Sequence, residues 1–195
     1  LLDCCGGSGT ICIVAATQIP GLRALTVDTD EQATCVAREN VAAAARLQLL
    51  APNATVEVRC GRAEDEGAEE GNVASVDVVV SELPFGCSYR RRIWAAPFLD
   101  SLAAVLRPSF GRAVLVVPCG DRAEFDAAVV AAKPDIWAHP NGAEWRSATV
   151  GGLRVSVGLL KRGPAGFLRE PSHPGSTGAR DEVEHEEACD EMHSA

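Results

Sequence analysis

The stretch that decides the fold is DCCGGSGT at residues 3–10, which the apolar run ICIVAA at residues 11–16 follows directly. An acid ends a short hydrophobic segment, three glycines come next, and a helix-forming run begins immediately afterwards. This order is typical of an open α/β sheet that brings its backbone close to a bound nucleoside. We therefore expect a Rossmann-like fold with helices on both faces of the sheet and a ligand site at this turn.

The rest of the chain alternates between strand-like and helix-like segments. Strands are predicted at residues 23–28, 55–60, 76–80 and 112–117, helices at 10–18, 31–50, 91–106 and 121–132, and a hairpin at 147–150 and 153–160. Because the hairpin closes a series of strand-helix units, the pattern favours a mostly parallel sheet with an antiparallel last strand rather than a plain dinucleotide-binding sheet.

Two of the helices carry further signals. The helix at 31–50 is expected to bury a stripe of Val36, Val41 and Leu47, and Pro52 is expected to stop it. The helix at 121–132 begins at Asp121, an acid of the type that caps helix N-termini.

The glycine loop favours a nucleoside cofactor that carries no phosphate. A P-loop needs a lysine after its last glycine, yet no lysine precedes Lys133, and the dinucleotide fingerprint needs a third glycine where Cys12 stands. A nicotinamide-dependent oxidoreductase is therefore a distant alternative. The predicted cofactor-binding residues at this edge are Asp3, Gly7, Ser8, Gly9, Thr10 and Ser81. A tight strand-to-helix turn without a ligand is the alternative interpretation.

Asp28 ends the second strand about twenty residues after the glycines, where an acid can accept both hydroxyls of a ribose. Asp30 follows two residues later, directly before the predicted helix. Either acid could simply cap that helix. We favour ribose binding for Asp28 and capping for Asp30.

A second motif, SELPFG at residues 81–86, follows the predicted strand at 76–80 and so lies at the same sheet edge as the glycine loop. A conjugated exocyclic amine is a poor nucleophile. It attacks a methyl sulfonium only when oxygen atoms accept hydrogen bonds from its N–H groups and hold its lone pair in line with the methyl group. The predicted catalytic residues are Glu82, Leu83, Pro84 and Phe85: a carboxylate, a backbone carbonyl, a rigid turn and a flat face for the base. The alternative is a strand-ending turn whose Phe85 belongs to the core.

Length and composition bound the remaining possibilities. With 195 residues, 47% of them hydrophobic, the chain can bury one sizeable core, and we expect one catalytic domain over 1–163. Residues 164–195 read as an acidic disordered tail, since residues 170–195 hold eight acids against one arginine. The rest of the chain is nearly neutral, so charge decides neither for nor against RNA. Because the sequence opens inside a predicted strand, we expect it to continue a longer protein.

Eight cysteines are spread along the chain without metal-binding spacing, and no apolar stretch reaches the ~20 residues of a membrane span. We interpret the cysteines as reduced interior thiols of a cytoplasmic protein, with the nucleus as the alternative, and we expect neither a metal site nor membrane association.

The two motifs, in this order, resemble those of the THUMP-associated RNA guanine-N2 methyltransferases. DCCGGSGT resembles their Asp-Pro-x-Cys-Gly-Ser-Gly-Thr loop, and ELPFG at 82–86 resembles their Asp-Leu-Pro-Phe-Gly motif. The later segments LRP at 106–108 and VGGLR at 150–154 are similar to further landmarks, so the resemblance spans about residues 1–162. It implies S-adenosyl-L-methionine as methyl donor, a seven-stranded sheet, an RNA substrate (tRNA or small nuclear RNA), and a small zinc-binding activator subunit.

The chain departs from the family pattern at three positions. Cys4 stands in place of a proline, Arg62 in place of an adenine-contacting acid, and Glu82 in place of an aspartate. Glu64 or Asp65 could supply the missing acid, although both could equally be solvated loop charges. The extra methylene of Glu82 leaves open a catalytically weak or inactive methyltransferase-fold binding module. Because a similar motif would serve other amide or amine nitrogens, an amino methyltransferase that acts on protein glutamine or a DNA base is a further alternative.

Overall fold

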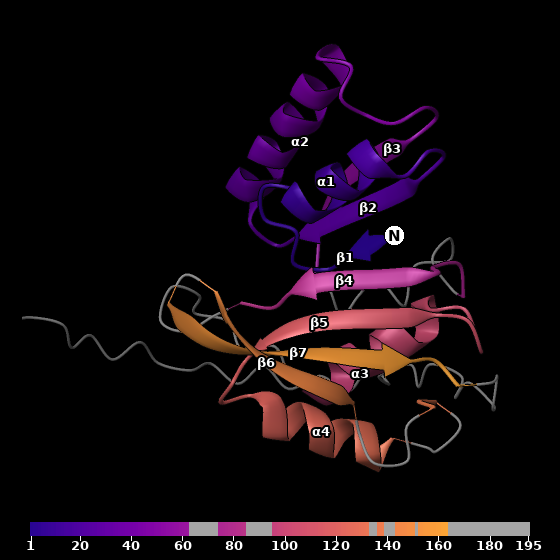
Figure 1. The fold of residues 1–195 in the computed structure, drawn as a ribbon, viewed down its shortest axis with the longest axis vertical. Helices are drawn as coiled ribbons and strands as arrows, with labels where there is room; N and C mark the ends of the chain where they lie inside the picture. The colour runs from indigo at the N-terminus through magenta and orange to yellow at the C-terminus, as the bar shows by residue number, and fades with distance from the viewer. Residues whose placement is uncertain (63–73, 85–94, 133–135, 139–142, 151, 164–195) are drawn as a thin grey trace, which may run out of the picture.

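The computed structural model describes residues 1–62, 74–84, 95–132, 136–138, 143–150 and 152–163. Within these residues, seven strands form one sheet in the order β3-β2-β1-β4-β5-β7-β6 (Figure 1). The strands are β1 (Leu2–Asp3), β2 (Arg23–Asp28), β3 (Thr55–Cys60), β4 (Val78–Glu82), β5 (Arg112–Pro118), β6 (Glu144–Val150) and β7 (Leu153–Lys161). Strand β7 runs antiparallel to both of its neighbours and the other pairings are parallel, so the predicted fold class is confirmed.

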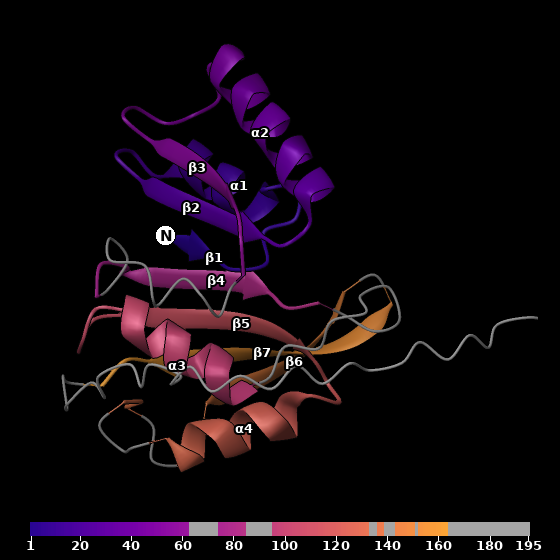
Figure 2. The same ribbon diagram turned by 180° about the vertical axis from the view of Figure 1, so that it is seen from behind.

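In the same described ranges, four helices cover the sheet: α1 (Thr10–Gln18), α2 (Glu31–Arg46), α3 (Ala95–Val105) and α4 (Arg122–Ala131). From β1 the chain moves outward through β2 to β3, and from β4 it moves in the opposite direction to β5. Right-handed crossovers in opposite directions place their helices on opposite faces. Seen from behind, α3 therefore lies in front of β5, whereas α1 and α2 accompany the first three strands (Figure 2). The reversal puts β1 beside β4 in the middle of the sheet.

The core of the second half lies between α3, α4 and the sheet. Phe98 of α3 is fully buried and meets Phe125 of α4 edge to face, with ring centroids 6.3 Å apart. On β5 the burial alternates residue by residue, and Ala113, Leu115 and Val117 are the buried members. This alternation shows that one face of β5 packs on helices.

Helix α2 differs from its prediction in length and in its buried face. It ends at Arg46 rather than at Leu50, because Gln48 takes a left-handed conformation with φ of 55° that no helix accommodates. Val36 and Leu47 are 45% and 65% exposed, and the buried residues are instead Thr34, Ala37 and Ala44. These small side chains let the helix lie close to the sheet and to the glycine loop, where larger residues would hold it away.

Three other elements also differ from their predicted bounds. Strand β4 spans 78–82 rather than 76–80, and Val76 forms only an isolated bridge with Leu106, so Ser81 and Glu82 belong to the strand itself. That bridge also ends α3 one residue before the predicted position, while residues 91–94 lie outside the described residues. Helix α4 spans 122–131 rather than 121–132, and Asp121 occupies its N-cap position without a capping hydrogen bond from its side chain.

The predicted hairpin is confirmed, with Val150 paired to Leu153, although β6 begins earlier, at Glu144. The ring of Trp145 lies over Gly158, where any Cβ would overlap it. The indole N–H of Trp145 donates to the Asp126 carboxylate, and the Arg122 guanidinium lies 5.9 Å from the centre of the ring. Helix α4 and the hairpin are thus joined around one aromatic side chain.

The six described cysteines are free thiols, in line with the expectation of reduced cysteines. Their expected burial holds in part, because Cys4 and Cys12 are buried whereas Cys35, Cys60 and Cys119 are exposed. The exposed ones occupy the outer side of α2 and the ends of β3 and β5. Over the described parts of the chain, no helix is long and apolar enough to cross a membrane. The tail prediction for 164–195 lies outside the described residues.

Candidate nucleoside-binding site

Asp3 lies at the end of β1, where this strand meets β4, and its side chain is buried. Its Oδ1 accepts hydrogen bonds from the Ser81 hydroxyl at 2.9 Å and from the Cys5 backbone N–H at 3.2 Å. Its Oδ2 is buried without a hydrogen-bond partner. Burial, with smaller contributions from the negative charges of Asp28 and Glu82, raises the pKa of the Asp3 carboxyl to about 6.

The glycine turn is held tightly against β2. The Gly6 N–H donates to the Val27 carbonyl at 2.9 Å, and a Cβ at Gly6 would overlap Thr26 Oγ1. Gly9 has φ of +81° and serves as the N-cap of α1, where its N–H donates to the Gly6 carbonyl at 2.7 Å. Only residues without a side chain allow this close approach and this left-handed conformation at low cost.

Asp28 ties the glycine loop to the end of β2. Its Oδ2 accepts from the Gly7 N–H at 2.8 Å and its Oδ1 accepts from the Asp30 N–H at 2.9 Å. Each carboxylate oxygen has a second lone pair for a ligand hydroxyl. Asp30 caps α2 by accepting from the N–H groups of Gln32 and Ala33. The two acids therefore differ in role, and the capping prediction for Asp30 is confirmed.

Ser8 and Thr10 lie on the exposed side of the loop, with their hydroxyl oxygens 3.0 Å apart. The Ser8 carbonyl accepts a hydrogen bond from the Asn40 side-chain amide of α2 at 3.0 Å. Asn40 was not predicted as a loop-positioning residue. The sequence did hold a signal for this role, since Asn40 stands inside an alanine-rich helix. Asparagine is disfavoured inside helices because its side chain tends to hydrogen-bond to backbone groups, so its presence there indicates such a bond.

The second motif begins at the end of β4. Ser81 is buried, Glu82 is exposed, and the two residues pair with Leu115 and Val116 of β5. The Leu83 N–H donates to the Val116 carbonyl at 2.9 Å, which anchors the chain beyond the strand, and the Leu83 side chain is buried. Pro84 is half-buried. Phe85 and Glu64, both predicted site residues, lie outside the described residues.

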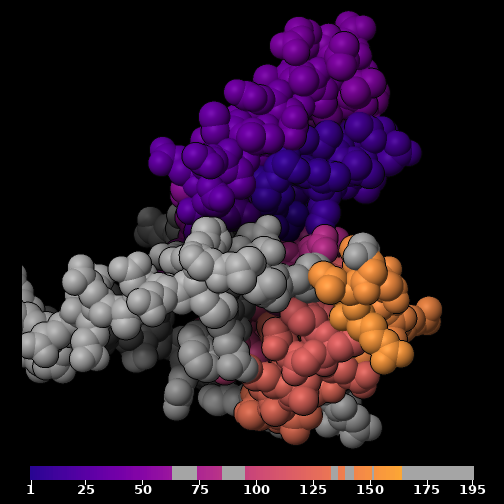
Figure 3. Space-filling model, turned by 90° about the vertical axis from the view of Figure 1, so that its left-hand side faces the viewer, coloured from indigo at the N-terminus to yellow at the C-terminus, as the bar shows by residue number. Residues whose placement is uncertain are grey.

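The two motifs therefore meet at the carboxyl edge of the sheet. The hydrogen bond from Ser81 to Asp3 joins residues that are 78 positions apart. Figure 3 looks onto this edge, where the surface of the first residues borders that of the region around β4. The described polar groups here are dominated by three carboxylates, those of Asp3, Asp28 and Glu82, whose mutual repulsion is evident at Asp3. Such a site favours a cationic ligand over a phosphate.

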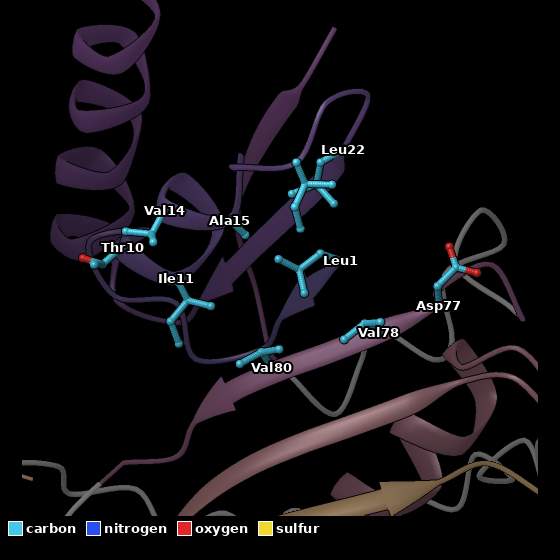
Figure 4. Close-up of a pocket in the computed structure, with 10 residues that line it drawn as sticks. Leu1, Thr10, Ile11, Val14, Ala15, Leu22, Asp77, Val78 and Val80 are labelled. Atoms are coloured by element: carbon cyan, nitrogen blue, oxygen red, sulfur yellow. The ribbon is translucent and has the colours of Figure 1, made fainter. Parts of the chain in front are cut away.

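A separate apolar groove of about 630 Å³ lies between α1 and the face of β4 (Figure 4). Its lining includes Leu1, Ile11, Val14, Val78 and Val80. Among the predicted site residues that the structure describes, Thr10 alone lines this groove, which therefore differs from the polar edge described above. Within the described ranges, no group of three or more His, Cys, Asp and Glu side chains is arranged to hold a metal ion.

Comparisons with known proteins place the fold. No protein-family profile and no curated protein matches the sequence. TrmN from Thermus thermophilus matches with a TM-score of 0.63 and 24% identity over 83% of this chain and 43% of TrmN. The putative methyltransferase yhhF from Escherichia coli matches with a TM-score of 0.56 and 19% identity over 84% of this chain and 77% of that protein. Magnesium protoporphyrin IX methyltransferase (ChlM) from Synechocystis PCC 6803, solved with bound SAM, matches with a TM-score of 0.55 and 14% identity over 83% of this chain and 68% of ChlM.

The chain thus has the Rossmann-like fold of the methyltransferases it matches. It spans less than half the length of TrmN.

Proposed function

We propose that this chain is the catalytic unit of an S-adenosylmethionine-dependent methyltransferase that modifies the exocyclic N2 amine of a guanosine in RNA, with tRNA as the substrate class. The observation that carries the proposal is the 2.9 Å hydrogen bond from Ser81 to Asp3, since it fixes the glycine loop beside the second motif. The methyltransferase fold supports it, and the order of the two motifs supports the RNA substrate.

The residues present at the loop fit this cofactor, which is a cation with a ribose and no phosphate. Asp3 Oδ2 is a buried acceptor without a donor, suited to the ammonium group of a methionine moiety. We assign the ribose hydroxyls to Asp28 and the nucleoside to the open space beside Gly7, where an added Cβ would meet nothing within 4 Å. Gly9, where an added Cβ would lie 3.3 Å from Ala37 of α2, remains a proposed contact through its backbone. Ser8 and Thr10 remain proposed contacts on the open side of the loop, and Glu64 remains a proposed contact to the base.

The acceptor side is assigned to the second motif. When bound, the cofactor supplies an electrophilic methyl group on a sulfonium. The Glu82 carboxylate and the Leu83 carbonyl would accept hydrogen bonds from the two N–H groups of the amine, which leaves the nitrogen lone pair facing the methyl group. The Glu82 carboxylate would take up the one proton that the nitrogen loses when it is methylated. Pro84 stiffens the turn and Phe85 offers a face to the base. Because a paired guanine cannot reach this edge, the target nucleotide leaves its stack.

Calorimetry and methyl transfer test the proposal together. S-adenosylhomocysteine should bind the purified chain, and labelled methyl groups should appear in RNA rather than in protein or DNA. Glu82→Ala should lower the transfer rate at least a hundredfold and leave cofactor affinity within about twofold. Glu57→Ala, an exposed glutamate in the middle of β3, is the matched control and should be silent. Full activity of Glu82→Ala would remove its assigned role.

A second candidate follows from Glu82 itself, which is one methylene longer than the aspartate of the family motif. If cofactor binds and no RNA pool is methylated, the chain is a binding module, and Glu82→Asp should then restore transfer. Label that appears in protein glutamine or in DNA would assign a different amine. The small zinc-binding activator subunit and the cytoplasmic location remain predictions. Transfer that requires an added partner protein would support the activator.

A further inference from the structure

Ser81 occupies an unusual place between the two motifs. Its side chain is fully buried, and its hydroxyl donates to Asp3 Oδ1 at 2.9 Å rather than facing the open edge. The next residue along β4 is Glu82, the proposed acceptor-side carboxylate. One hydroxyl therefore connects the strand of the second motif with the acid of the first.

The Asp3 carboxyl has unequal oxygens because of this bond. Oδ1 receives two hydrogen bonds, from Ser81 and Cys5, whereas Oδ2 is buried and receives none. A Cβ at Gly6 would lie 3.6 Å from Oδ2, so the glycine turn passes directly beside the unpartnered atom. The hydroxyl of Ser81 fixes which oxygen is left for a ligand.

The surroundings of Asp3 oppose its ionisation. Asp28 at the end of β2 and Glu82 at the end of β4 add negative charge, and burial removes water. Burial, and after it the charge of Asp3, raises the pKa of the Cys12 thiol of α1 to about 12, so that this thiol stays neutral. The Ser81 hydroxyl is the largest influence in the opposite direction, since it lowers the pKa of Asp3.

We propose that Ser81 is a positioning residue of the cofactor site: its hydroxyl bonds Oδ1 of Asp3 and leaves Oδ2 for the cationic end of the ligand. This inference rests on the proposed function, since it takes an ammonium-bearing nucleoside as the ligand. Binding of the methyl donor then depends on a hydrogen bond from β4, the strand that carries Glu82. A shift of β4 would change the position of Asp3 through this bond and so change the affinity for the cofactor.

The consequence is a specific dependence of affinity on pH. Only ionised Asp3 attracts an ammonium group, so affinity is full above the pKa of Asp3, about 6, and falls below it. At pH 5 the dissociation constant should be about tenfold higher than at pH 7.5. Loss of the Ser81 hydrogen bond removes a stabiliser of the anion, so the midpoint should move upward by about one pH unit.

The test measures binding of S-adenosylhomocysteine by calorimetry between pH 5 and 7.5, without any turnover. Ser81→Ala should shift the midpoint upward, Ser81→Thr should restore it because the hydroxyl returns, and Asp3→Asn should abolish this pH dependence. If Ser81→Ala does not fold, Ser81→Cys, a weaker donor of similar size, should give an intermediate midpoint. A carbonyl NMR titration of Asp3 in the ligand-free protein should report the same order of pKa values.

Parallel curves for wild type and Ser81→Ala, lowered equally at every pH, would show a packing role alone and overturn the inference. The proposed function would survive that result, because the wild type would still bind. Absence of binding by the wild type at pH 7.5 would instead remove the proposed function, and an unshifted NMR midpoint in Ser81→Ala would then overturn the Ser81 assignment separately.

Discussion

The two halves of the sheet prepare their parts of the site differently. In the first half, the loop between β1 and α1 is fixed by backbone and side-chain hydrogen bonds to Val27, Asp28 and Asn40, each from a different position in β2 or α2. In the second half, the described part of the acceptor motif is anchored by β4 pairing and by the Leu83 N–H. The loop proposed to bind the cofactor is thus held by several hydrogen bonds, and it adjoins a motif that begins at the end of β4.

This difference predicts which substitutions should change affinity and which should change the reaction rate. A preorganised loop binds with little entropic loss, and damage to it lowers affinity. A group that acts on the reacting amine contributes in the transition state, and damage to it lowers the rate. Substitutions in the first half should therefore change affinity or stability, whereas Glu82 should change turnover.

Gly6→Ala gives the largest expected effect in the first half. The new methyl group would overlap Thr26 Oγ1 and lie 3.0 Å from Thr26 Cβ, a buried side chain with little freedom to move. We expect a loss of about 3 kcal/mol in unfolding free energy, at the upper end of overpacking costs, together with loss of cofactor binding. Denaturant unfolding and calorimetry measure both. Gly120→Ala, with nothing within 4 Å of the added Cβ, is the control.

Asp3→Asn should stabilise the protein at neutral pH while weakening binding. The pKa of Asp3 rises from its ordinary value of 3.8 to about 6 in the folded protein, so folding favours the protonated form. Ionisation of Asp3 therefore leaves the free energy of unfolding unchanged below pH 3.8 and lowers it by up to about 3 kcal/mol above pH 6. Asp3→Asn cannot ionise, so it should regain part of this free energy at pH 8 and none at pH 3.5.

Unfolding midpoints across this pH range check the prediction. Asp100→Asn, on the exposed side of α3, is the control and should leave the difference between pH 8 and pH 3.5 unchanged. A gain that is equal at both pH values would contradict the assigned cost of ionisation.

Asp28→Ala should lower cofactor affinity by about thirtyfold, or about 2 kcal/mol. The variant leaves the N–H groups of Gly7 and Asp30 without their present acceptor and removes the proposed ribose contact. Calorimetry with S-adenosylhomocysteine and with S-ribosylhomocysteine, which lacks the base, separates ribose from base contacts. Unchanged affinity would mean that the loop holds its shape without this acid.

Asp30→Ala should give the smallest effect, a loss of about 1 kcal/mol in stability with cofactor affinity preserved. Asp30 lies two residues beyond Asp28, and its carboxylate caps α2 by accepting from the N–H groups of Gln32 and Ala33. The pair of variants at positions 28 and 30 thus separates binding from capping. A loss of affinity in Asp30→Ala comparable to that in Asp28→Ala would break the distinction.

Much of this fold could be predicted because local patterns coincide with the final packing. The strands at 23–28 and 55–60 and the helix at 10–18 have the predicted bounds, since Gly, Pro and Asp punctuate each of them. The buried face of α2 could not be predicted from hydrophobic size. One of its buried residues, Ala37, faces the glycine loop, where a Cβ at Gly9 would lie 3.3 Å from the Ala37 Cβ, so a small residue is required there.

The candidate site shows the same limit. The sequence predicted that Asp3 and Ser81 share one sheet edge on neighbouring strands, but not that the two side chains bond, because that depends on the register of β1 against β4, with Leu2 opposite Val79. Asn40 was missed for a similar reason, since its partner is the Ser8 carbonyl 32 positions earlier. Both contacts follow from strand register and helix packing, which no local pattern carries.

The insertion of β7 between β5 and β6 also constrains how the molecule is made. Strand β6 precedes β7 in the chain, yet β7 is its sole neighbour in the sheet that the described residues form. During synthesis, β6 must wait unpaired until residues 153–161 leave the ribosome, and β5 meanwhile exposes an open edge. A stop codon at position 152 would therefore remove the pairing of two strands, and the truncated product should be prone to aggregate.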